Sequence, residues 1–134
     1  MNKMIKISLK LIFLLSLLAL TQCKRFNYRT FKPIDRASID SVIIELHEKP
    51  SQPSKKLTAV QVDELVKNIN SAKPVGPYKG VVTYRFYIYQ TKPLSKDTST
   101  RFIMASESLF KFKHELGDDT FEVPDATLFE RLSR

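Results

Sequence analysis

The side chains that most often act as bases and nucleophiles are scarce in this sequence, which has two histidines and one cysteine. His47 and His114 fall at the ends of two segments with strand-like hydrophobic alternation, so they could meet across a sheet. Nucleophilic catalysis also needs a nucleophile and an orienting group, and no motif around either histidine supplies them. We therefore predict that the protein is not an enzyme. The alternative is a small hydrolase that uses His47 or His114 with neighbouring carboxylates.

The sequence also predicts no metal and no cofactor. A zinc site takes about four ligands at short spacings, which two remote histidines and one cysteine do not provide. The Gly117-Asp118-Asp119 segment lacks the repeating oxygen ligands of a calcium loop, so we interpret it as an acidic hairpin turn. The three glycines of the chain are all isolated, which argues against a glycine-rich phosphate loop.

The cysteine, Cys23, stands directly behind an apolar segment near the N-terminus. Lys3, Lys6 and Lys10 give the start of the chain a positive charge without any acidic residue, and residues 11–20 have only one polar member. A positive segment followed by a short apolar one is typical of a secretory signal peptide. A membrane-spanning helix needs about 20 apolar residues, so this segment is too short to span comfortably.

The residues Leu20-Thr21-Gln22-Cys23 resemble the lipobox of bacterial lipoproteins. In that family a lipid is attached to the cysteine thiol and the leader is removed just before it. The resemblance therefore implies a signal peptide over residues 1–22 and a membrane anchor on Cys23. Gln22 stands where the family usually has Gly, Ala or Ser. Two other interpretations stay open, namely an ordinary secretory cut that leaves an incidental thiol and an uncleaved anchor helix.

Lys24 directly follows the predicted lipid-modified residue. In enteric lipoproteins an aspartate at this position marks retention in the inner membrane. The resemblance thus favours a cell-envelope protein on the periplasmic face of the outer membrane, if the source is a diderm. With one cysteine in the chain, an internal disulfide is impossible, which leaves the thiol for the lipid.

The basic charge of the chain is concentrated near its N-terminus. Of the formal net charge of +8, the leader contributes +3, and residues 23–36 contribute +4 from five basic residues and one acidic residue. The remainder from Ala37 onward carries only +1. A nucleic-acid-binding domain would hold its basic excess on the folded part, so we expect no nucleic-acid partner. Basic residues beside a lipid anchor are instead attracted to anionic lipid.

The mature chain is long enough for one domain. We divide the sequence into a signal peptide at 1–22, a basic tether at 23–36 and a small domain at 37–134. The tether contains Phe26, Tyr28 and Phe31, so it is too aromatic for a fully flexible linker. These rings could lie on lipid headgroups or fold back onto the domain.

The first half of the domain predicts one strand and one helix. The segment "SIDSVIIELHE" alternates in hydrophobicity, which is typical of a strand with one buried face. Thr58 and Gln61 form a capping box at the start of a helix predicted to extend to Ala72. One face of this helix is apolar and carries Val62, Leu65, Val66 and Ile69.

The second half predicts strands joined by short turns. They lie in "GVVTYRFYIYQTK", "TRFIMAS", "SLFKFKHEL" and "TFEV", and Asp125 is placed to cap a final short helix. The predicted fold class is α+β, an antiparallel sheet of four to five strands with helices packed on it, in the order β-α-β-β-β-(β)-α. This order resembles that of several small bacterial lipoproteins without assigned function.

One surface remains as a candidate binding site. Arg85, Tyr87 and Tyr89 share one face of the strongest predicted strand, and Tyr78 could extend this set. Tyrosine and arginine are enriched at binding hot spots, although they also occupy ordinary strand positions. The competing interpretation is that the C-terminal helix covers this face. We expect a lipid-anchored, non-catalytic binding or accessory domain whose partner is an envelope protein or glycan.

Overall fold

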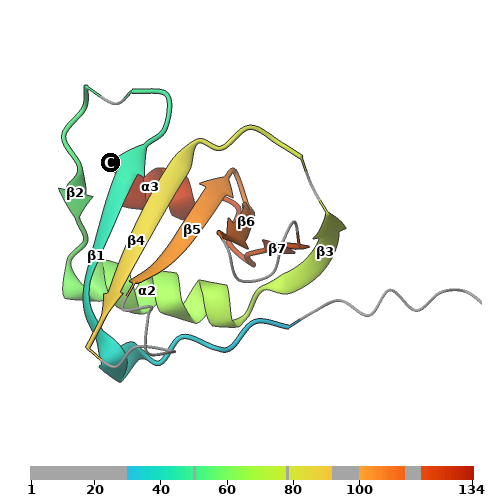
Figure 1. Ribbon diagram of the computed structural model, residues 1–134, viewed down its shortest axis with the longest axis horizontal. Coiled ribbons are helices and arrows are strands. Elements are labelled where there is room, and N and C mark those ends of the chain that lie inside the picture. Colours follow the sequence, from blue (N-terminus) through green and yellow to red (C-terminus); the bar gives the residue numbers. More distant parts are fainter. Residues whose placement is uncertain (1–29, 50, 78, 92–99, 114–118) are drawn as a thin grey trace, which may run out of the picture.

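The computed structural model describes residues 30–49, 51–77, 79–91, 100–113 and 119–134. Within these residues the chain forms one antiparallel sheet of seven strands, in the spatial order β2-β1-β4-β5-β6-β7-β3 (Figure 1). The strands are β1 (Ile39–Leu46), β2 (Lys55–Lys56), β3 (Lys73–Pro77), β4 (Tyr84–Gln90), β5 (Thr100–Ser106), β6 (Leu109–Phe112) and β7 (Asp119–Glu122). The helical elements are the 3-10 turn η1 (Arg36–Ser38) and the α-helices α2 (Ala59–Asn70) and α3 (Leu128–Ser133). The predicted α+β class is therefore correct.

The predicted number and order of strands need correction, because β2 and β3 were not expected. Strand β3 has the sequence KPVGP, which reads as a loop because two prolines remove backbone donors. It lies at one edge of the sheet, paired only with β7, and an edge strand tolerates proline. Strand β2 is two residues long and forms the opposite edge, next to β1. A strand this short leaves no alternating pattern in the sequence.

Helix α2 begins and buries its side chains as the sequence predicts. Thr58 accepts a hydrogen bond from the Gln61 N–H at 3.3 Å, and Gln61 accepts one from the Thr58 N–H at 3.0 Å. This capping box satisfies two backbone donors that the helix itself cannot pair. The buried residues of the helix are Val62, Leu65, Val66 and Ile69.

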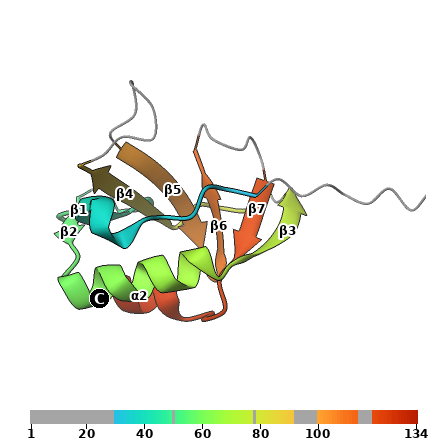
Figure 2. The same cartoon turned by 90° about the horizontal axis from the view of Figure 1, so that it is seen from below.

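The two α-helices lie on the same face of the sheet, which we call the inner face (Figure 2). Its fully buried strand residues include Val42, Phe86, Ile88, Ile103 and Phe112. Phe129 of α3 packs on this face, with ring centroids 5.5 Å from Phe86 and 6.5 Å from Tyr84. The C-terminal helix therefore does not cover the face that carries Tyr87.

The start of α3 differs from the prediction in one detail. Thr127 occupies the N-cap position, and its side chain makes no capping hydrogen bond. Asp125 lies two residues earlier and accepts hydrogen bonds from both the backbone N–H and the hydroxyl of Thr127, each at 2.9 Å. These bonds, together with an ion pair to Arg131, hold the pKa of the Asp125 carboxyl below its usual range. Asp125 thus stabilises the turn that leads into the helix.

The end of the predicted tether packs against the inner face. The ring of Phe31 contacts Phe112 and Phe121, with centroids 5.0 and 4.8 Å apart. Ile34 is buried, and its backbone N–H and C=O are bonded by the side chain of Asn70 at 2.8 and 2.9 Å. In Figure 2 this segment runs across the molecule from the β7 side towards β1. Within the described residues, packing against the inner face thus begins at Phe31 and not at Ala37.

A buried arginine fixes this segment. Arg101 is 1% exposed, and its guanidinium lies 4.2 Å from the centroid of the Phe112 ring. It donates a hydrogen bond of 2.9 Å to the backbone carbonyl of Lys32. A guanidinium tolerates burial better than an ammonium because it is less strongly hydrated and stacks on aromatic rings. Arg101 therefore joins β5 to the N-terminal segment.

Candidate functional site

The opposite face of the sheet, which we call the outer face, is not covered by either α-helix (Figures 1 and 2). In β4, Phe86 and Ile88 point to the inner face and are buried. The intervening residues, Arg85, Tyr87 and Tyr89, therefore point to the outer face. All three predicted binding residues thus lie on the side of the sheet that lacks helices.

The strand register places aromatic side chains in one row across the outer face. Tyr87 lies directly between Ile43 of β1 and Phe102 of β5. The rings of Tyr87 and Phe102 are 4.8 Å apart between centroids and tilted by 38°. Lys113, just beyond β6, places its Nζ atom 5.1 Å from the centroid of Phe102. The row therefore ends in a cation held over an aromatic ring.

A second row lies beside the first and carries more charge. Arg85 is directly between Glu45 of β1 and Met104 of β5, and Met104 is opposite Lys111 of β6. Thr100, opposite Tyr89, begins the next row on the other side of the aromatic one. The row of Tyr87 and the row of Arg85 together form the centre of the outer face. This centre contains two aromatic rings and the thioether of Met104, and basic side chains lie next to them.

The centre of the outer face is a shallow, open hollow of about 520 Å³. Its lining comes from β4, β5 and the end of β6, and consists of Arg85, Tyr87, Thr100, Phe102, Met104 and Lys113. Two of the three predicted binding residues, Arg85 and Tyr87, thus line one hollow. Tyr89 is 38% exposed and lies beside the hollow, opposite Thr100.

The other lining residues were missed from the sequence. Phe102, Met104 and Lys113 lie in segments that were predicted as strands, but their neighbours depend on the hairpin register. A one-residue shift of the register would move Phe102 away from Tyr87 and turn it to the other face. Arg101 is buried on the inner face, so its neighbour Phe102 points to the outer face. Hydrophobic alternation alone does not predict a buried arginine.

The surroundings of Tyr87 alter its ionisation. Its hydroxyl donates a hydrogen bond of 3.2 Å to Glu45 Oε2. Partial burial, and then the negative charge of Glu45, raise the pKa of the Tyr87 hydroxyl, and Arg85 partly opposes this rise. The hydroxyl therefore stays protonated and remains a hydrogen-bond donor at neutral pH.

A second hollow of about 420 Å³ adjoins the first at Arg85. His47 is exposed at the end of β1 and lines it, together with Glu45 and the 51–54 loop. In the described part of the chain, no three histidine, cysteine, aspartate or glutamate side chains come close enough to hold a metal ion. His114, Cys23 and Tyr78 lie outside the described residues, so their predicted roles stay predictions.

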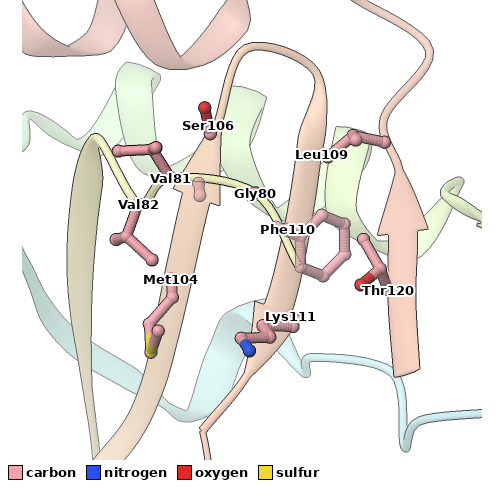
Figure 3. A pocket seen from close by; sticks show the side chains of 10 residues that line it. Gly80, Val81, Val82, Met104, Ser106, Leu109, Phe110, Lys111 and Thr120 are labelled. Carbon is pink, nitrogen blue, oxygen red and sulfur yellow. The ribbon is translucent and has the colours of Figure 1, made fainter. Parts of the chain in front are cut away.

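One end of the outer face is closed by the connection between β3 and β4. Gly80, Val81 and Val82 pass over β5 and β6, above Met104 and Lys111 (Figure 3). The cavity left beneath them is about 30 Å³, which is room for roughly one water molecule. This cavity is too small for a ligand. The hollow around Tyr87 and Phe102 is the candidate site, because it is lined by the predicted residues Arg85 and Tyr87.

No family model, curated protein sequence or solved structure matches this chain. Within the residues that the structure describes, no helix is long and apolar enough to cross a membrane.

Proposed function

We propose that this protein is a lipid-anchored lipoprotein of the cell envelope whose small domain acts by binding a partner, without catalysis. The lipobox-like Leu20-Thr21-Gln22-Cys23 supports the lipid anchor, and Lys24 supports the periplasmic face of the outer membrane. The partner meets the outer face of the sheet, at the hollow between Arg85 and Lys113.

One observation carries this proposal, namely the gathering of aromatic and basic side chains on a face of the sheet that neither α-helix covers. Tyr87 and Phe102 are only half-buried although they are adjacent across β4 and β5. Large apolar side chains left together at the surface cost free energy, which binding recovers by removing them from water. Arg85 and Lys113 border these rings and would pair with acidic groups of a partner.

Site-specific photo-crosslinking in intact cells tests this function. A photoreactive amino acid replaces Tyr89, which is 38% exposed beside the hollow, and a matched control replaces Val60, which is 76% exposed on α2. We expect a discrete crosslinked product from position 89 and none from position 60. The additional change Tyr87→Ala should abolish the product while the domain stays folded.

Two results would overturn the proposal. Equal crosslinking from positions 60 and 89 would mean that the outer face has no special role. Loss of both the product and the folded state with Tyr87→Ala would mean that Tyr87 serves packing alone.

A further inference from the structure

We infer that the hollow on the outer face binds an acidic polysaccharide, one whose sugar rings carry carboxylates. This inference rests on the proposed function, since it names the class of partner for the same face. Three features of the hollow carry it: an aromatic floor, groups that suit sugar hydroxyls, and a border of cations.

The floor of the hollow suits the flat side of a sugar ring. Tyr87 and Phe102 lie 4.8 Å apart between centroids and are tilted by 38°. The faces of aromatic rings carry partial negative charge, and one side of a pyranose ring presents polarised C–H bonds that pack against such faces. Two adjacent rings on neighbouring strands give a platform wider than one side chain. Met104 extends this platform with a polarizable thioether.

The polar groups around the floor suit hydroxyls. Glu45 is an acceptor, the Tyr87 hydroxyl is both donor and acceptor, and the two are 3.2 Å apart. Thr100 adds a further hydroxyl at the opposite side of the floor. Glu45 lines the adjoining hollow and lies beside the floor, where it would repel a densely charged polyphosphate chain. A sugar with free hydroxyls satisfies the same carboxylate by donating to it.

Among the residues that the structure describes, basic side chains outnumber acidic ones at the border of the hollow. Arg85 and Lys113 line it, and Lys56 lies opposite Ile43 on β2. Glu45 is the acidic member of the same two rows. Arg85 presents a planar set of donors that matches a carboxylate in a bidentate manner. The complement of this border is a ligand with spaced single negative charges.

The openness of the hollow suits a polymer. Its lining extends across β4 and β5 to Lys113, just beyond β6, and it adjoins the second hollow through Arg85. A chain of sugars could therefore pass over the surface, with one ring above Tyr87 and Phe102 and its neighbours along the strands.

Equilibrium binding of defined probes to the full chain, purified in a non-ionic detergent, tests this inference. The probes are polygalacturonate, a neutral galactan, polyglutamate, and vesicles that contain anionic phospholipid. We expect polygalacturonate to bind most tightly, because it alone combines carboxylates with sugar rings. The neutral galactan lacks the charge, and polyglutamate lacks the ring.

Two variants and one matched control separate the contributions of ring and charge. Phe102→Leu keeps an apolar strand residue but removes the ring, and should weaken polygalacturonate binding by roughly tenfold. Lys113→Gln should weaken it and reduce its salt dependence. Lys67→Gln removes an exposed charge from α2, away from the hollow, and should leave binding unchanged.

Each contrary outcome has a distinct meaning. Equal affinity for polyglutamate, or an unchanged affinity of a folded Phe102→Leu variant, would overturn the sugar-ring inference. Preferential binding to anionic vesicles would mean that the partner is a membrane surface and not a polysaccharide. If polygalacturonate fails to bind but position 89 still crosslinks to a protein, the polysaccharide is wrong and the proposed binding function stands. If polygalacturonate does not bind and position 89 does not crosslink, the polysaccharide inference and the proposed binding function are both wrong.

Discussion

The hydroxyl of Tyr87 donates a hydrogen bond of 3.2 Å to the carboxylate of Glu45 across strands β4 and β1. The two residues are diagonal neighbours, since Tyr87 lies directly opposite Ile43. The bond holds the phenol ring in place in the floor of the hollow, so the ring is oriented before any ligand arrives. Such preorganisation reduces the side-chain entropy lost on binding.

This pair predicts a pH dependence. Burial and the charge of Glu45 raise the pKa of Tyr87 above its ordinary value of 10.0. The folded state therefore holds this proton more tightly than the unfolded chain. Its contribution to stability is complete below pH 10.0 and is lost as the pH rises through the raised pKa. NMR titration of ¹³C-labelled tyrosine, assigned with Tyr87→Phe, measures the pKa directly.

The matched change Glu45→Gln removes the charge and keeps an acceptor. The pKa of Tyr87 should then fall part of the way towards 10.0, because burial remains. An unchanged pKa in this variant would show that Glu45 does not act on the hydroxyl electrostatically.

A second prediction concerns the packing of α2 on the inner face. Leu65 is 0% exposed, so Leu65→Ala should lower the free energy of unfolding by about 2–5 kcal/mol. Val60 lies on the same helix and is 76% exposed, and Val60→Ala should change stability by no more than about 0.5 kcal/mol. Urea unfolding followed by circular dichroism measures both. Similar unfolding midpoints for the two variants would contradict the assigned helix face.

A third prediction concerns the N-terminal segment. Phe31 packs between rings of β6 and β7, so Phe31→Ala should lower the free energy of unfolding by roughly 1–3 kcal/mol. Lys32→Ala is the matched control, because its side chain is exposed and its carbonyl still accepts the bond from Arg101. Equal stability of the two variants would mean that the segment contributes nothing to the fold.

The parts of the fold that depend on local pattern could be predicted from the sequence. The capping box of Thr58 and Gln61 and the apolar stripe of α2 are both set by residues a few positions apart. Alternation likewise located β1 and β4. Strand β3 could not be predicted, because it pairs with β7, whose residues are more than 40 positions away. Its sequence KPVGP is also rich in proline and glycine, which are typical of loops.

The candidate site was only half predictable for the same reason. Arg85 and Tyr87 lie on the same face because side chains alternate along a single strand. This alternation can be predicted from the sequence of that strand alone. Phe102 lies beside Tyr87 because β4 pairs with β5 in one particular register. The sequence pattern of a single strand does not predict that register. The packing of Phe31 is a similar case: its basic surroundings indicated a tether, whereas three distant phenylalanines determine its position.

The last prediction concerns the lipid anchor on Cys23. Cys23→Ala should move the protein from the membrane fraction to the soluble fraction, because each acyl CH₂ withdrawn from the bilayer costs about 0.8 kcal/mol. The intact mass of the wild type should show loss of residues 1–22 and a diacylglycerol-sized addition. Gln22→Ala is the matched control: it introduces a residue usual for the lipobox and should keep the protein on the membrane. A Cys23→Ala variant that stays on the membrane to the same extent would disprove the anchor.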